Sequence, residues 1–184
     1  MPKHVLVILA EGHEEVEALT QVDLLRRVDI KVTVAGLSGI EVKGSHNITV
    51  KTDITLDKFS GYFDGIILPG GMPGTVYLYR SVKVLTLVRE AYKKGLLCAA
   101  ICAAPLVLET AGILEGKKYT CYPSIEEKIK SGIFVKEKVV QDGNIITSRG
   151  VGTAIPFALR IVEYLVGKEK SDTLAEQIVY SGNL

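Results

Sequence analysis

The sequence HVLVILA at residues 4–10, followed by a helical pattern at residues 14–28, decides the fold class. Six consecutive apolar residues after His4 are typical of a strand that is buried on both faces of a parallel sheet. Between Val16 and Leu25 an apolar residue recurs at every third position, which places these side chains on one face of a helix. A buried strand followed by an amphipathic helix is the repeating unit of α/β proteins.

The same alternation continues to the end of the chain. We expect further strands at residues 30–35, 46–51, 61–68, 96–101 and 119–121, a hairpin at 139–147, and helices at 76–94, 103–111, 153–166 and 171–180. No repeat, low-complexity tract or Pro/Ser-rich linker separates these segments. The sequence therefore predicts one domain over residues 1–184, an α/β three-layer sandwich with a mostly parallel sheet.

Composition excludes several classes of protein. The 184 residues carry a net charge of +1, and 47% of them are hydrophobic, which excludes a disordered chain and gives no field for nucleic acid or a membrane surface. No apolar run approaches the ~20 residues of a membrane helix, and acidic residues follow the first ten instead of a cleavage site. Three cysteines form no closed disulfide framework and no zinc pattern. We expect a cytoplasmic protein without a metal site.

The residues that could take part in catalysis or ligand binding lie in four predicted strand-to-helix loops. Right-handed crossovers place such loops at the carboxyl edge of the sheet, where ligands of open α/β sheets bind. The four loops are residues 11–17, 69–74, 102–105 and 148–152.

Cys102 stands where the buried strand at 96–101 runs straight into a helix. This pattern predicts a nucleophile elbow, in which the residues two before and two after, here Ala100 and Ala104, must be small. The helix N-terminus would stabilise a Cys102 thiolate, and the amide of Ala103 could support an oxyanion. The alternative is that Cys102 is a small buried hydrophobic residue.

The other two cysteines are interpreted as packing residues. Cys98 lies in the middle of the predicted strand at 96–101. Cys121 lies near a strand end, and redox pairing with Cys102 is the alternative for it.

Two further loops offer glycines and carboxylates. Gly70 and Gly71 follow a strand and could bring backbone amides close to a ligand, although a tight turn alone would also explain them. The four carboxylates of the loop at residues 11–17 would repel a phosphate and argue against flavin mononucleotide, whereas one protonated carboxyl could donate a hydrogen bond to a thiolate. The residues do not distinguish among Glu14, Glu15 and Glu17 for this role, and an acidic first helical turn is the alternative.

Arg149 precedes the predicted helix at 153–166. Its guanidinium could bind a carboxylate or an oxyanion bidentately, but the residues alone favour a pair with a surface acid.

The segments VLVILAEGHEEVE, ILPGGMPG, AAICAAP and ITSRGVGTA together resemble the ThiJ/PfpI superfamily, in the branch of the Parkinson-associated protein DJ-one and its bacterial ThiJ-like relatives. The resemblance covers residues 3 to about 180, with the motifs in the same order. It implies a flavodoxin-like three-layer α/β/α sandwich with a nucleophile elbow, a homodimer and no cofactor.

The resemblance also implies roles for individual residues. Cys102 would be the reactive cysteine, and Glu17 the protonated carboxyl that contacts its sulfur. The amides of Gly71 and Ala103 would bind an oxyanion in a pocket shaped by Gly70.

Three departures from the family pattern are visible. Ala103 replaces the histidine of the PfpI protease branch, which argues against peptidase activity. Tyr122 precedes a proline where the human-like branch has a histidine, so that a Cys/His pair is missing and Tyr122 could donate a hydrogen bond. His46 replaces a pocket arginine of that branch, which weakens anion capture there.

The family implies two alternative functions. The first is a glutathione-independent glyoxalase or deglycase, which acts on methylglyoxal, glyoxal or their early adducts through a Cys102 hemithioacetal and protects against oxidative stress. The second is a redox-sensing chaperone, whose cysteine oxidises to sulfinate without physiological turnover.

Overall fold

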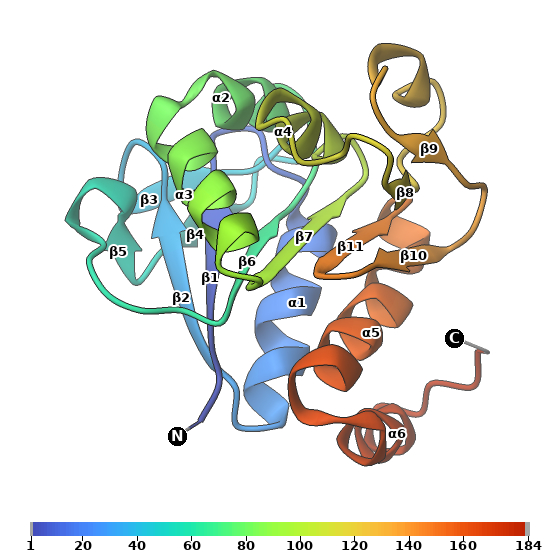
Figure 1. Cartoon of the computed structure of the whole chain (residues 1–184). Coiled ribbons are helices and arrows are strands. Elements are labelled where there is room, and N and C mark those ends of the chain that lie inside the picture. The colour runs from blue at the N-terminus through green and yellow to red at the C-terminus, as the bar shows by residue number, and fades with distance from the viewer. Residues whose placement is uncertain (1, 183–184) are drawn as a thin grey trace.

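The computed structural model describes residues 2–182, which build a seven-stranded sheet between two layers of helices (Figure 1). The strands are β1 (His4–Leu9), β2 (Lys31–Gly36), β3 (Glu41–Lys43), β4 (Thr49–Lys51), β5 (Ile54–Thr55), β6 (Gly65–Leu68), β7 (Leu97–Ile101), β8 (Lys118–Tyr119), β9 (Ile133–Phe134), β10 (Val139–Asp142) and β11 (Ile145–Ser148). The helices are α1 (Glu15–Arg27), α2 (Gly74–Arg80), α3 (Val82–Lys93), α4 (Pro105–Thr110), α5 (Ala154–Val166) and α6 (Lys168–Gln177). Among residues 2–182, no helix combines the length and the apolar character that crossing a membrane requires.

The main sheet has the strand order β10-β11-β7-β6-β1-β2-β5. Its neighbours pair in parallel except β10 and β11, which form the predicted antiparallel hairpin with Gly143 in the turn at a φ of 61°. This topology confirms the flavodoxin-like α/β class and the mostly parallel sheet expected from the sequence.

Both faces of the sheet are buried, which explains the continuous apolar run at its centre. Val5 and Val7 of β1 pack into the core under α1, α5 and α6, whereas Leu6 and Ile8 pack into the core under α2, α3 and α4. Successive residues of a strand point to opposite faces, so a central strand covered on both sides needs apolar residues at every position.

The segment expected as one helix at 76–94 is instead two helices, and the expectation was wrong at Ser81. Ser81 has an extended backbone, with a φ of −79° and a ψ of 112°. Its hydroxyl accepts a hydrogen bond from the Val84 amide at 3.3 Å and so begins α3. A serine that satisfies a free amide at a helix start favours a new helix over continuation of the old one.

The short strands were predicted less accurately than the long ones. β4 is only part of the strand expected at 46–51, and it pairs with β3 outside the main sheet. Likewise β8 pairs with β9 in a separate two-stranded sheet. The strand expected at 61–68 begins only at Gly65, and α6 begins three residues earlier than expected, directly after Gly167. Partners distant in sequence determine these edges, and local pattern does not encode them.

The strand order brings the four predicted loops together. β11, β7, β6 and β1 are consecutive in the sheet, and each is followed by one of the loops that carry the candidate site residues. Because these strands are parallel, their carboxyl ends meet at one edge (Figure 1).

Candidate active site

Cys102 forms the elbow that the sequence predicted. Its φ is +65°, a left-handed conformation that a residue with a side chain adopts only under constraint. The constraint comes from both sides, because the Cys102 amide donates to the Ser148 carbonyl at 3.0 Å and the Cys102 carbonyl accepts from the Tyr122 amide at 2.9 Å. The sequence predicted that the helix after the elbow begins at Ala103, but it begins at Pro105. The charge on the Cys102 sulfur is therefore influenced more by nearby backbone amides than by the dipole of a long helix.

Two glycines of the loop after β6 face this elbow. A methyl group on Gly70 would come within 2.5 Å of the Cys102 Cβ and 2.6 Å of the Glu17 Oε2, so only glycine fits between them. Gly71 has a φ of +91°, and a side chain there would overlap the Glu14 amide at 2.3 Å. The amides of Gly71 and Ala103 act on the Cys102 sulfur, and both lower the pKa of its thiol.

Glu17 is the carboxyl group that the fold brings to Cys102. It lies in the first turn of α1 and is fully buried. Its Oε2 accepts a hydrogen bond from the Gly70 amide at 3.0 Å, whereas its Oε1 is buried without a partner among the described residues. Burial raises the pKa of Glu17 from 4.5 to about 7, and its Cys102 and Gly70 contacts oppose this shift only in part. Near neutral pH this group is poised to hold or release a proton.

The geometry distinguishes the three glutamates that the sequence left open. Glu14 precedes α1, and its carboxylate accepts a hydrogen bond from the Glu17 amide at 2.7 Å, so it caps the helix. Glu15 points away toward His46, and its carboxylate accepts the His46 amide at 2.7 Å. Only Glu17 lies against the sulfur.

The ionisation of Cys102 depends on Glu17. Burial, followed by the negative charge of the Glu17 carboxylate, raises the pKa of the Cys102 thiol to about 12, while the amides of Gly71 and Ala103 lower it. The thiolate that a helix N-terminus was expected to stabilise is therefore disfavoured in the resting site, because burial and the Glu17 charge outweigh the two amides. Repulsion by the carboxylate disappears once Glu17 carries a proton, so the two groups titrate as a pair.

The sulfur lies at a cleft of about 480 Å³. Its lining comes from three of the four predicted loops and from the segment after β8: Glu14, Glu17, Cys102, Tyr122, Pro123, Arg149, Gly150, Val151, Gly152 and Thr153. The exposed Tyr122 ring lies beside Gly150, where a methyl group would come 3.4 Å from its Cδ2. Tyr122 therefore lines the cleft, near the pocket where the family resemblance had placed it.

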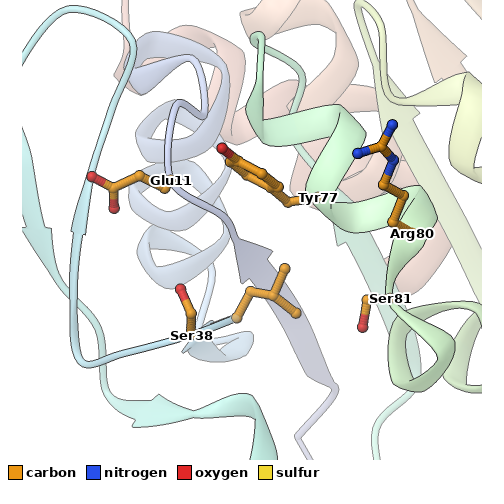
Figure 2. A pocket seen from close by; sticks show the side chains of 6 residues that line it. Glu11, Ser38, Tyr77, Arg80 and Ser81 are labelled. Atoms are coloured by element: carbon orange, nitrogen blue, oxygen red, sulfur yellow. The ribbon is translucent and has the colours of Figure 1, made fainter.

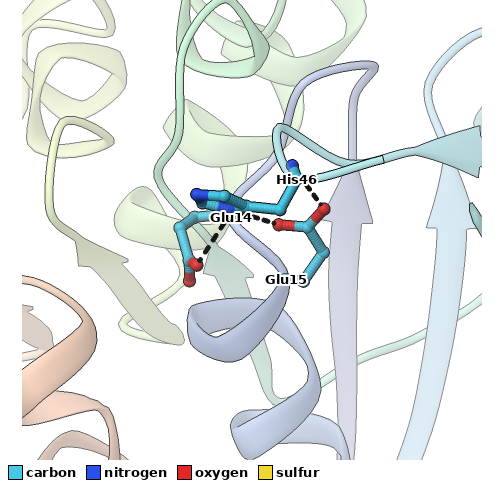
Figure 3. A group of neighbouring side chains, drawn as sticks. All are labelled: Glu14, Glu15 and His46. Carbon is cyan, nitrogen blue, oxygen red and sulfur yellow. Dashed lines mark hydrogen bonds and ion pairs between the residues drawn. The ribbon is translucent and has the colours of Figure 1, made fainter. Parts of the chain in front are cut away.

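His46 does not line this cleft, although it had been expected near the pocket. Its exposed ring lies beside Glu15 (Figure 3). The His46 Nδ1 is 2.9 Å from Glu15 Oε2 and 3.7 Å from Glu14 Oε1. The contact with Glu15 raises the pKa of His46 and lowers the pKa of Glu15 to about 2. These three side chains offer ligand atoms within 4.8 Å of one another. Hydrogen bonds already engage both oxygens of Glu15, so we interpret the cluster as a clamp between α1 and the loop after β3.

The remaining cysteines lie away from the cleft. Cys98 is buried in the middle of β7, where burial raises its pKa to about 12, in line with the packing role assigned to it. Cys121 is also buried and is not bonded to another cysteine. Cys121 packs in the core under α2, α3 and α4, whereas Cys102 packs against the opposite core. This placement favours the packing role of Cys121 over redox pairing with Cys102.

Arg149 does not form the surface pair that the residues alone favoured. Among residues 2–182, no carboxylate lies within 4 Å of its guanidinium. Arg149 lines the cleft, and its guanidinium carbon stands 5.8 Å from the centre of the Phe134 ring. Thr153 is a site residue that the sequence did not predict, and its hydroxyl accepts the Arg149 and Gly150 amides at 3.2 and 3.1 Å. A threonine three residues after a glycine, at the start of a predicted helix, is a capping pattern that could have indicated this role of Thr153.

A second cleft of about 400 Å³ opens at the same edge of the sheet, beyond β1 (Figure 2). It is lined by Glu11, Leu37, Ser38, Tyr77, Arg80 and Ser81. None of these residues offers a thiol or a buried acid, so the cleft at Cys102 is the candidate active site.

A strained cysteine elbow at the carboxyl edge of a parallel sheet, beside a buried acid and facing backbone amides, is the arrangement typical of α/β proteins that use a cysteine nucleophile. The model of the DJ-1/PfpI family matches residues 3–164, and the chain belongs to this family.

Individual relatives agree with this assignment. The chain is 46% identical to protein dj-1beta of Drosophila melanogaster, with all of both chains covered. The crystal structure of Drosophila DJ-1beta has a TM-score of 0.96 to this chain at 45% identity, covering 99% of this chain and 100% of that one. A relative in Caenorhabditis elegans, named glutathione-independent glyoxalase DJR-1.2, is 37% identical over 96% of each chain.

Gly70→Ala should damage the site because its methyl group must displace the Cys102 Cβ or the Glu17 carboxylate. We expect the free energy of unfolding to fall by about 1–3 kcal/mol, as for other overpacked positions. Gly39→Ala is the matched control, since its nearest contact would be an ordinary 3.7 Å. Urea unfolding measures both variants, and equal stabilities would contradict the close approach.

Glu17 should make the protein less stable as the pH rises. Its pKa in the folded state, about 7, is above the ordinary 4.5, so the folded protein holds this proton more tightly than the unfolded chain. The contribution of protonated Glu17 is complete below pH 4.5 and is lost between pH 4.5 and 7.

Glu17→Gln removes this titration, so its stability relative to wild type should increase by roughly 2–3 kcal/mol between pH 5 and pH 8. Urea unfolding at both pH values measures the difference, and Glu115→Gln, at an exposed position, is the control. A stability difference that is the same at both pH values would show that Glu17 has an ordinary pKa.

Proposed function

We propose that this protein is a cysteine-dependent glyoxalase and deglycase that acts on methylglyoxal, glyoxal or their early adducts on proteins and nucleotides. The observation that carries the proposal is the position of Cys102, at an open cleft between two backbone amides and a carboxyl group whose pKa is about 7. The name of the Caenorhabditis elegans relative supports the glyoxalase reaction at the level of the family.

The first chemical step is addition of sulfur to the aldehyde carbon. Above neutral pH the Glu17 carboxylate accepts the thiol proton of Cys102 as the carbon–sulfur bond forms, acting as a general base. The carbonyl π electrons move onto the aldehyde oxygen, and the amides of Gly71 and Ala103 stabilise this oxyanion. Protonation of the oxygen completes a hemithioacetal.

The second step isomerises the hemithioacetal of methylglyoxal. Glu17 removes the proton from the former aldehyde carbon and returns a proton to the adjacent carbon, which turns the hemithioacetal into a thioester of lactate. Water then adds to the thioester carbonyl, the carbon–sulfur bond breaks, and the thiol is regenerated. One methylglyoxal and one water give one lactic acid, so no external oxidant or cofactor enters the balance.

Early adducts fit the same chemistry. In an adduct of methylglyoxal with an amine, the leaving group is the amine, which takes a proton from Glu17 when its carbon–nitrogen bond breaks. The cleft is open enough for an adduct that protrudes from a larger molecule, and this supports the deglycase part of the proposal.

Loss of the sulfur should abolish turnover. We expect Cys102→Ser to lower the kcat for methylglyoxal by at least about 10³-fold, because an alcohol is a far weaker nucleophile than the Cys102–Glu17 pair. Lactate formation over many equivalents per subunit measures the activity. Cys98→Ala is the control, since that thiol is buried in the core away from the cleft. Persistent turnover by Cys102→Ser would exclude this mechanism.

A redox-sensing chaperone is the second candidate function. The Oε1 of Glu17 has no partner among the described residues, and a protonated Glu17 could donate from it to a sulfinate on Cys102, alongside the amides of Gly71 and Ala103. Two equivalents of hydrogen peroxide would convert the thiolate to sulfinate and two waters.

Mass spectrometry after peroxide treatment distinguishes this function. We expect a gain of two oxygens on Cys102 in wild type, and further oxidation to sulfonate in Glu17→Ala, which lacks the hydrogen bond that holds the sulfinate. Chaperone activity that changes with oxidation, without methylglyoxal turnover, would replace the enzyme proposal. The same product from wild type and Glu17→Ala would contradict a role of Glu17 in this chemistry.

The assembly and the compartment belong to the proposal as well. The resemblance supports a homodimer, for which the expected mass is twice the 20.0 kDa of one chain. The three free thiols support a reducing compartment such as the cytoplasm.

A further inference from the structure

Arg149 places a cation in the cleft that holds Cys102. It follows β11, and it lines the cleft together with Cys102 and Tyr122. The Phe134 ring, 5.8 Å from the guanidinium carbon, supports the side chain by a cation–π contact. A planar guanidinium on a ring is an oriented donor of hydrogen bonds.

This guanidinium has no partner in the part of the chain that the structure describes. Its Nη1 is buried without a hydrogen-bond acceptor, and no carboxylate lies within 4 Å of its nitrogens. The half-buried Arg160, eleven residues further along, pairs with Glu163 at 3.0 Å. Removing a charge from water without a partner is costly, so Arg149 is a site at which an anion would be bound favourably.

The backbone around Arg149 is fixed, so the guanidinium is presented on a rigid loop. The Thr153 hydroxyl accepts the amides of Arg149 and Gly150, and it lies 2.7 Å from the Ser148 hydroxyl. Ser148 in turn donates to the Lys138 carbonyl at 2.7 Å. A ligand therefore pays little of the entropy of ordering this loop.

Charge is distributed unevenly across the cleft. Glu14 and Glu17 reach it from α1, whereas Arg149 reaches it from the loop after β11. Cys102 follows β7, the strand that pairs with β11. A substrate with a reactive carbonyl at one end and an anionic group at the other would be oriented by this polarity, with its carbonyl at the sulfur.

We propose that Arg149 binds an oxyanion substituent of the substrate, so that this protein prefers 2-oxoaldehydes carrying a phosphate or a carboxylate over neutral ones. The preference for such substrates rests on the proposed glyoxalase function, whereas the anion site itself does not. Phosphate and carboxylate share the oxygen geometry that a guanidinium binds bidentately.

Equilibrium binding tests the anion site without catalysis. Glycerol 3-phosphate and lactate are the unreactive probes for the two anions, and glycerol is the neutral probe, each titrated calorimetrically into wild type, Arg149→Gln and Arg160→Gln. We expect the phosphate, the carboxylate or both to bind wild type and Arg160→Gln, and to bind Arg149→Gln at least about tenfold more weakly. Equal affinity of each anion for wild type and Arg149→Gln, or no binding to wild type, would overturn the site.

Kinetics then test the substrate preference. The probes are methylglyoxal, hydroxypyruvaldehyde and hydroxypyruvaldehyde phosphate, of which only the last is anionic. For Arg149→Gln we expect kcat/KM to fall about 10- to 100-fold with the phosphorylated substrate and to change less than about threefold with the neutral ones. Equal losses with all three substrates would overturn the preference. If wild type turns over none of them but binds an anion through Arg149, the proposed function fails while the anion site stands.

Discussion

The close approach of Gly70 to both Cys102 and Glu17 is the constraint on which the candidate site depends. No side chain fits at this position, so the loop after β6 passes directly against Cys102, which follows β7, and against the Glu17 carboxylate of α1. The Gly70 amide uses this proximity to hydrogen-bond one oxygen of Glu17 and leaves the other oxygen without a partner among the described residues. Glycine therefore creates the space and orients the acid at the same time.

Burial of Glu17 explains why the site has one acid that can perform several steps. A carboxyl group with a pKa of about 7 exists in both forms near neutral pH, so it can accept a proton from sulfur and later donate one to carbon or nitrogen. Neither Ala103 nor Tyr122 supplies an imidazole to share this work. The same burial destabilises the folded protein when Glu17 is ionised, and functional sites commonly reduce stability in this way.

The central parts of the fold could be predicted from the sequence because local pattern and tertiary role agree there. The apolar run of β1 is buried on both faces, and the small residues around Cys102 fit an elbow with a φ of +65°. Local pattern failed where a single side chain or a distant partner decides the outcome. Ser81 ends one helix and begins another, and β3 and β4 pair outside the main sheet.

The candidate site shows the same division. Cys102 followed from its place between strand and helix, but the choice of Glu17 needed the family resemblance or the structure, since three glutamates share one helical turn. The direction of the Cys102 pKa shift also could not be predicted from the sequence. It depends on the competition between burial, a neighbouring carboxylate and two amides, each of which comes from a different segment.

Arg149 shows why a charged side chain without a partner is harder to predict than a paired one. Most exposed arginines find an acid, so the residues alone favoured a pair, and no local signal marks a guanidinium that lacks one. The structure places Arg149 and Glu17 in the lining of one cleft, together with Cys102, which follows the strand that pairs with β11. The guanidinium charge would compensate an anion held at Arg149, so Glu17 could stay ionised and accept the thiol proton of Cys102. Binding of the substrate and activation of the sulfur would then be carried by separate groups of the same cleft.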